Sequence, residues 1–281
     1  MSEDPTGETN AKSATRGSSG VTRRRLLAGS ATAAAAGLAG CLGTREGPVP
    51  APTVTSDRID DWRLLDESES TVFEQSYGPV TVTALEHTRI YEYVSVAEAL
   101  SDAFGASGSP VVFFATRIDV RPAVDTLPGG IGRERLMTEV ESAAVDAFRS
   151  QLRASGIENV EIVDEGTSTV KSGHTATTWR LEGEFDFDGE VPLPDGSTTD
   201  FSEAVPIASR LGVWHDGTDV LVAGGAHPAE RLTETIDGAL PDGVDAETAI
   251  GGLAGADAAE ALATEPGSFD EDISLLLISV E

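Results

Sequence analysis

The chain has 281 residues, of which 40% are hydrophobic and 5% aromatic, and this length suits one sizeable core, so we expect one domain plus a tail. Its 48 acidic residues outnumber 19 basic ones, and the resulting net charge of −29 repels nucleic-acid phosphates, so the composition argues against nucleic-acid binding. The single cysteine excludes an internal disulfide framework and a multi-cysteine zinc site.

The acidic residues are spread along the whole chain, and only Lys12 and Lys171 are lysines. This composition resembles that of proteins from halophilic archaea, which work in concentrated salt, where the Debye length falls to about 3 Å at 1 M. The resemblance implies a surface whose carboxylates stay hydrated while salt screens their mutual repulsion.

An arginine run and an alanine-rich apolar stretch form the first legible element. Residues 23–25 are arginines, and the uncharged residues 26–40 are too short and small-sided to cross a bilayer as a stable helix. A cationic start, an apolar stretch and small residues before a cut are the order of a signal peptide. The alternative is a buried N-terminal helix that carries a stray core cysteine.

Two motifs favour the signal. The run "TRRRLL" resembles the twin-arginine export signal, with Arg23 and Arg24 as its pair and leucine where the pattern often has phenylalanine. The run "LAGC" resembles a lipobox, which implies a signal peptide over 1–40 and Cys41 as the lipidated first residue of the mature chain. Two lipid chains on Cys41, each contributing about 0.8 kcal/mol of binding free energy per buried CH₂, would anchor the protein in membrane lipid on the outer face of the cell membrane.

The lipidated cysteine is followed by a proline-containing segment. Residues 41–56 are therefore predicted to be an extended tether, and 57–281 a single extracytoplasmic domain. No second apolar run approaches the roughly 20 residues that a spanning helix needs.

The domain is predicted to begin with a strand, a helix and a strand. Residues 79–94 are rich in β-branched and aromatic types, which favour a strand. The run "SVAE" from Ser95 predicts a capping box that opens a short helix ending at Phe104. Residues 111–121 then alternate as a second strand.

The clearest helix is predicted over 133–156, because its apolar residues fall on one stripe and Gly156 is placed as a C-cap. Strands follow at 159–166 and 174–189, and the second has the most regular alternation in the chain. Its inward row is predicted to be Trp179, Leu181, Phe185 and Phe187. Its outward row is Arg180, Glu182, Glu184, Asp186 and Asp188.

The last part of the chain opens with a predicted hairpin that turns at Asp216 and Gly217. Pro228 is placed to begin a helix, and a weaker helix is predicted over 245–263, where glycines lower the propensity. The apolar run at 272–281 is predicted to be a closing strand.

These elements predict an α+β fold, a mainly antiparallel β-sheet packed by one long helix and shorter helices. The order of elements over roughly 131–240 loosely resembles the PsbP-like sandwich found in several exported lipoproteins. That resemblance implies an accessory or binding role rather than a chemistry.

Catalytic and phosphate-binding motifs are not evident. The glycines of "PGGIGRER" lack the spacing of a phosphate loop, and "GASGSP" lacks that of a nucleophile elbow. His215 stands beside Asp216 as a conceivable base and orienter, but neighbours in a turn do not form a triad, and an exposed turn is the alternative. The other histidines, His87, His174 and His227, are too scattered to indicate a metal site.

A row of carboxylates on the long strand leaves two interpretations open. Glu182, Glu184, Asp186, Asp188 and Glu190 could bind a hard cation such as calcium, or could form a solvated face in salt. Alternate residues stand about 6.6 to 7 Å apart along a strand, so one ion could not collect them without loops.

The sequence therefore predicts a lipid-anchored envelope accessory or binding module, with an envelope protein or a small ligand as its partner, no cofactor and no catalytic residue. The first alternative is a hydrolytic or metal-assisted enzyme whose site is assembled from distant residues. The second is a structural surface component that presents its acidic face to neighbours.

Overall fold

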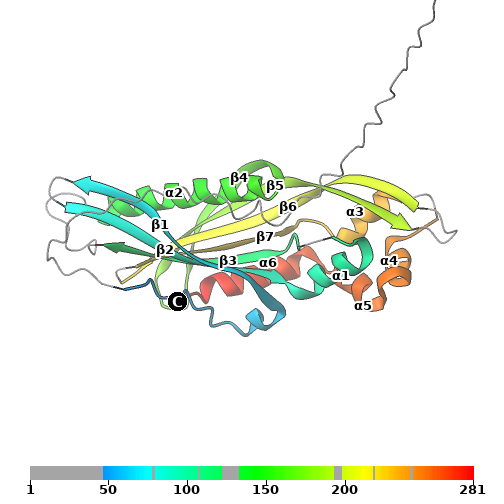
Figure 1. Ribbon diagram of the computed structural model, residues 1–281, viewed down its shortest axis with the longest axis horizontal. Coiled ribbons are helices and arrows are strands. Elements are labelled where there is room, and N and C mark those ends of the chain that lie inside the picture. Colours follow the sequence, from blue (N-terminus) through cyan, green and yellow to red (C-terminus); the bar gives the residue numbers. More distant parts are fainter. Residues whose placement is uncertain are drawn as a thin grey trace, which may run out of the picture. The chain divides into compact units, whose positions relative to one another are not determined.

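A computed structural model describes residues 47–77, 80–106, 108–121, 133–192, 198–217, 219–240 and 243–281, all within the unit Ala36–Glu281. The chain order of its elements can be followed by colour in Figure 1. The strands are β1 (Trp62–Tyr77), β2 (Val80–Tyr93), β3 (Val112–Arg121), β4 (Ile157–Thr169), β5 (Thr175–Pro192), β6 (Thr198–Asp216) and β7 (Asp219–Pro228). The helices are a 3-10 turn (Asp57–Asp61), α1 (Val94–Phe104), α2 (Arg133–Ala154), α3 (Leu232–Ala239), α4 (Ala246–Ala254), α5 (Ala256–Leu262) and α6 (Pro266–Ile278).

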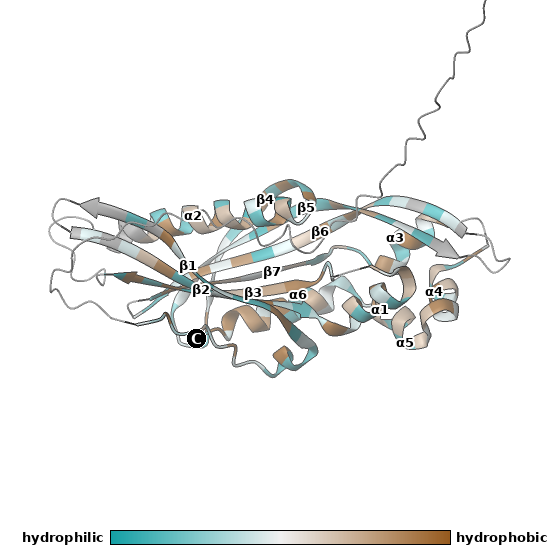
Figure 2. Ribbon diagram, in the orientation of Figure 1, coloured by the Kyte–Doolittle hydropathy of each residue, from teal (hydrophilic) through white to brown (hydrophobic). Residues whose placement is uncertain are grey.

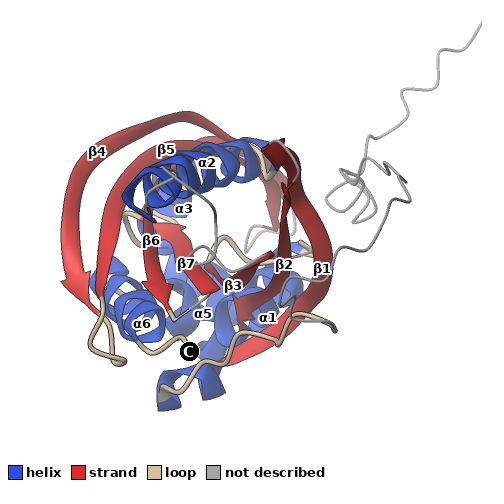
Figure 3. Ribbon diagram, turned by 90° about the vertical axis from the view of Figure 1, so that its left-hand side faces the viewer, coloured by secondary structure: helices blue, strands red, loops and turns tan. Residues whose placement is uncertain are grey.

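The strands form one sheet in the order β1-β2-β3-β7-β6-β5-β4, and every pair of neighbours is antiparallel. This confirms a mixed fold built on a mainly antiparallel sheet. The sheet curls strongly about its long axis, with β1 and β4 as its edges (Figure 3). Strong curling follows from the twist that accumulates over long neighbouring strands.

Helices lie on both faces of the curled sheet. Helix α2 lies within the curve, while α1, α5 and α6 lie outside it (Figure 3). On the inner face the rings of Phe148 and Phe114 lie 5.4 Å apart, and Thr177 donates a hydrogen bond to Glu141 of α2 at 2.8 Å. The core therefore has two layers, one on each side of the central strands.

Strand β5 has the predicted alternation. Trp179 and Leu181 are buried, whereas the acidic side chains of its outward row are exposed. The predicted hairpin at Asp216 and Gly217 is also confirmed, because β6 and β7 pair on either side of it.

The closing strand predicted over 272–281 is wrong, because α6 ends at Ile278 and only Val280 makes an isolated bridge, to Val54. The apolar residues of this run lie along one face of a helix, where Ile273, Leu276 and Leu277 are buried. This stripe packs on small residues of the sheet: carbon atoms of Leu277 stand next to Gly212, and those of Ile273 next to Gly225. Figure 2 shows apolar residues in α6 and in the nearby strand β3.

Three other local predictions are corrected. Helix α1 begins at Val94 after Tyr93, and no side chain caps it, so the capping box at Ser95 is wrong. Pro228 ends β7 instead of opening a helix, and α3 begins at Leu232. The helix predicted over 245–263 is two helices, because Gly255 at φ +95° breaks the chain direction.

Among the described residues, no helix combines the length and apolar character needed to cross a membrane.

Candidate functional site

The predicted export-signal residues Arg23 and Arg24 and the predicted lipidation residue Cys41 lie outside the described residues. So do residues 41–46 of the predicted tether. The structure therefore first describes the chain at Gly47, six residues beyond Cys41.

Residues 47–56, here called the strap, lie on the outer face of the sheet. Val49 and Pro52 are buried, so the strap packs onto the domain instead of projecting from it. The backbones of Thr53 and Glu281 exchange two hydrogen bonds, each of 2.8 Å. The strap therefore pairs with the last residues of the chain.

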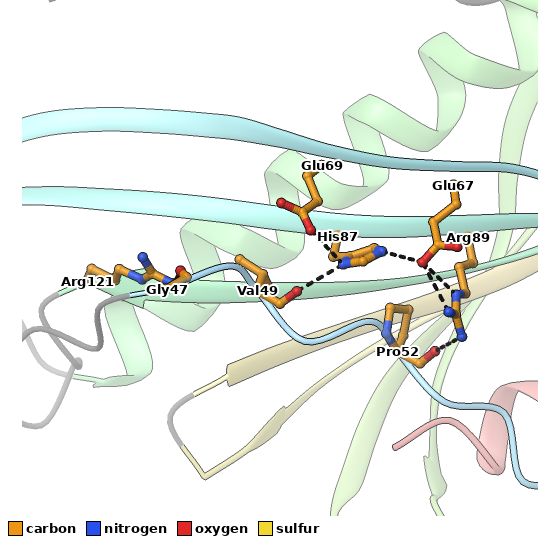
Figure 4. Close-up of polar contacts among 8 residues, drawn as sticks. All are labelled: Gly47, Val49, Pro52, Glu67, Glu69, His87, Arg89 and Arg121. Carbon is orange, nitrogen blue, oxygen red and sulfur yellow. Dashed lines mark hydrogen bonds and ion pairs between the residues drawn. The ribbon is translucent and has the colours of Figure 1, made fainter.

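Three side chains of the sheet hold the strap by its backbone carbonyl groups (Figure 4). His87 Nδ1 donates to the oxygen of Val49 at 2.9 Å, and Arg89 Nη1 donates to that of Pro52 at 3.3 Å. Arg121 Nη2 donates to the oxygen of Gly47 at 2.7 Å. The two arginines are charged donors, and charged donors make stronger hydrogen bonds than neutral ones, so these contacts fix the path of the strap.

A carboxylate organises two of these donors. Oε1 of Glu67 accepts from His87 Nε2 at 2.7 Å and from Arg89 Nε and Nη2 at 3.1 and 3.0 Å. The hydrogen bonds from His87, and then those from Arg89, hold the pKa of Glu67 below its ordinary value. Glu69 adds a second carboxylate 3.4 Å from His87 Nδ1.

The register of the sheet explains why these groups share one face. His87 and Arg89 are two residues apart on β2, so their side chains point to the same face. His87 stands opposite Arg117 of β3, and Arg89 stands opposite Glu67 of β1. The same face continues through Arg117, whose Nη1 donates to Asp219 at 3.2 Å. A strip of paired charges thus crosses four strands beneath and beside the strap.

Sequence reasoning did not find this strip. The run "EHTRIYEY" held a hint of it. Its polar residues point to both faces of the strand, although helices and chain cover the outer face. His87 is 7% exposed, and both of its ring nitrogens face acceptors. Its geometry therefore serves to hold chain segments together.

A second candidate is a shallow hollow of about 490 Å³ beside the β6–β7 turn, lined in part by Glu141, His174 and His215. Glu141 accepts the hydrogen bond from Thr177, and His174 Nε2 lies 3.4 Å from Asp216. The hollow brings His215 near a carboxylate and a second histidine. It does so through the N-terminal half of α2, which is distant in sequence.

The remaining predicted residues take core positions. Trp214 is 1% exposed, although it also borders the hollow. His227 is buried in β7, where its Nδ1 donates to the carbonyl oxygen of Pro228 at 2.8 Å, and burial holds its pKa below the ordinary value.

The acidic row of β5 lies on the surface, and its far end meets Asp200 of β6 at an open depression of about 500 Å³. Within the described ranges, no three His, Cys, Asp or Glu side chains are grouped so as to hold a metal ion. Two glutamates of the row stand opposite like charges of β4, in the pairs Glu182 with Glu161 and Glu184 with Glu158.

These facing carboxylates predict a salt-dependent stability. Removing one pair in the double variant Glu161→Gln, Glu182→Gln should raise the thermal midpoint by roughly 2 °C at low salt, because like charges opposite each other destabilise a sheet. At 1 M salt the gain should disappear, since the Debye length is about 3 Å there. Thermal unfolding followed by circular dichroism at both salt concentrations measures this difference.

The matched control is Glu74→Gln with Asp186→Asn, which also removes two charges, at exposed strand residues that stand opposite Thr83 and Ala204. It should give a smaller gain at low salt than removal of the facing pair. An equal gain from both would mean that total charge, rather than the facing pairs, sets the salt dependence.

The fold and the strap together define an acidic domain whose curled antiparallel sheet binds its own N-terminal segment. A family model with the description "Domain of unknown function (DUF6517)" matches residues 51–277, and the chain belongs to this family. No curated protein and no solved structure matches the chain.

Proposed function

We propose that the protein is a lipid-anchored extracytoplasmic module that acts as a non-catalytic accessory or binding protein of the envelope of a halophilic archaeon. The strap carries this proposal. It begins six residues after Cys41, and three side chains and the C-terminal backbone hold it on the sheet. A lipid on Cys41 would therefore be joined to the folded domain by a short segment.

The chemistry of the charged strip also supports a binding role. Backbone carbonyl groups accept hydrogen bonds from His87, Arg89 and Arg121. Such contacts hold a polypeptide segment in place and do not activate a substrate. The likeness to a PsbP-like sandwich, with α2 as its long packing helix, is part of the same proposal and is consistent with an accessory role.

Separate variants of the export signal and the lipidation residue test this proposal. In an archaeal host with a twin-arginine pathway, Cys41→Ser should move the protein from the membrane fraction to the medium. Arg23→Lys with Arg24→Lys should retain the precursor in the cell. Immunoblots of cell, membrane and medium fractions measure both shifts, and unchanged distributions in both variants would refute the proposal.

One observation favours the enzyme alternative, because the hollow beside the β6–β7 turn brings His174, His215 and Glu141 together. A hydrolase working there should cleave simple ester substrates, and His215→Ala should abolish that cleavage while leaving the thermal midpoint unchanged. The third possibility is a structural surface component, which would present the acidic row of β5 to neighbouring molecules.

A further inference from the structure

We propose that the strap sets the orientation of the domain on the membrane. The end of the sheet where Arg121 holds Gly47 faces the lipid surface, and the tip of the β5–β6 hairpin points away from it. This inference rests on the proposed lipid at Cys41. It adds which surface faces lipid and which is open to partners.

The place where the strap begins is defined by the sheet register. Arg121 is the last residue of β3, and it stands opposite Thr83, which in turn stands opposite Glu74. Two residues earlier, Asp119 pairs with Asp219 at the β6–β7 turn. We call this part of the domain the near end. Figure 1 shows the strap, in blue, entering at this end of the sheet.

The acidic tip lies at the opposite end of the longest strand. Strand β6 runs from Thr198, beside the tip, to Asp216 at the near end, so at about 3.3 Å per residue the two ends are roughly 60 Å apart. The tip carries Asp188, Glu190 and Asp200, and in Figure 1 it lies at the end of the sheet near α3 and α4.

The length of chain between lipid and domain limits the possible orientations. Gly47 lies six positions after Cys41, and at no more than about 3.6 Å per position this stretch reaches about 20 Å. The near end must therefore stay close to the lipid. At low salt, where charges are screened least, anionic headgroups repel the acidic tip, which favours an upright domain over one lying along the surface.

The contacts along the strap keep this connection short. Were the donors at His87, Arg89 and Arg121 to release it, the first fixed point would become Thr53, which pairs with Glu281. The free stretch would then double to twelve positions and reach about 40 Å. The charged strip thus gives the strap a function, which is to hold the near end at the membrane.

Energy transfer from single labels to lipid tests the orientation. The lipidated protein is reconstituted into phosphatidylcholine and phosphatidylglycerol vesicles that contain acceptor-labelled headgroups. A donor dye is attached at Glu74→Cys or at Glu190→Cys, both exposed glutamates, and lipidation of Cys41 leaves the new thiol as the only free one. The near-end label should show at least about twofold greater transfer, because the two sites are about 50 Å apart along the strands.

Lengthening the connection provides a control that leaves the fold intact. Twenty Gly and Ser residues inserted between Cys41 and Gly47 should reduce the difference between the two labels, since a flexible segment of that length frees the near end. The strap variant His87→Ala, Arg121→Ala should act in the same direction.

Equal transfer from both labels, or greater transfer from Glu190→Cys, would overturn the orientation while membrane binding through Cys41 still held. Loss of vesicle binding altogether would instead refute the proposed lipid anchor. The two failures are therefore distinguishable.

Discussion

Replacing Gly224 by alanine should lower the free energy of unfolding by about 3 kcal/mol or more, the upper range for overpacking a core. Gly224 lies in β7 between β3 and β6, and an added Cβ would overlap the backbone oxygen of Arg210. It would also stand 3.1 Å from the ring of Phe114. Because the obstacle is backbone within a central strand pair, the sheet itself would have to shift. Urea unfolding in constant high salt, followed by circular dichroism, measures the loss.

The matched control is Gly252→Ala in α4, where no heavy atom lies within 4 Å of the added Cβ. This substitution should stabilise the protein by roughly 0.5 to 1 kcal/mol, because alanine restricts the unfolded chain and favours the helix. Equal effects at the two positions would show that β7 does not approach its neighbours as closely as described.

Alanine substitutions in the C-terminal apolar run distinguish a helix from a strand. Leu276→Ala and Leu277→Ala should each lower the free energy of unfolding by about 2 to 5 kcal/mol, because both side chains are 1% exposed or less. Two adjacent residues can both be buried in a helix that lies on a sheet. In a strand with one buried face, alternate residues would be exposed.

The control for this pair is Leu275→Ala, whose side chain is only half-buried. It should cost about 1 kcal/mol or less. A large cost at Leu275 together with a small one at Leu276 would indicate the alternation of a strand and contradict α6. Denaturant unfolding of the three variants under the same salt conditions makes the comparison.

Much of the sheet could be predicted because its strands carry a local signal. The alternation of β5 identified Trp179 and Leu181 as core residues and the acidic row as surface. The turn at Asp216 and Gly217 likewise identified the β6–β7 hairpin. Such features depend on period and turn chemistry within about ten residues, which a sequence displays directly.

The candidate site could not be predicted in the same way. The strap has the proline content of a free tether, and only its pairing with Glu281, far along the chain, shows that it is part of the domain. Arg121 pairs locally with Asp119, but the strap oxygens that Arg121 and His87 hold lie far away along the chain. The α6 error has a similar origin, since a short apolar run fits both a buried strand and a buried helix.

By itself, the sequence determined the positions of most strands, the exposure of the acidic row and the antiparallel character of the sheet, because local periodicity encodes which side chains face water. It did not predict the edge strand β1. Its N-terminal motifs also carry the prediction of export and lipidation at Cys41. Only the tertiary structure decided that the strap and the C-terminus pair, and that a strip of charges holds the strap by its carbonyl groups. Those contacts join residues that are distant along the chain. A buried donor must find an acceptor, but the sequence around it does not indicate which distant backbone oxygen that will be.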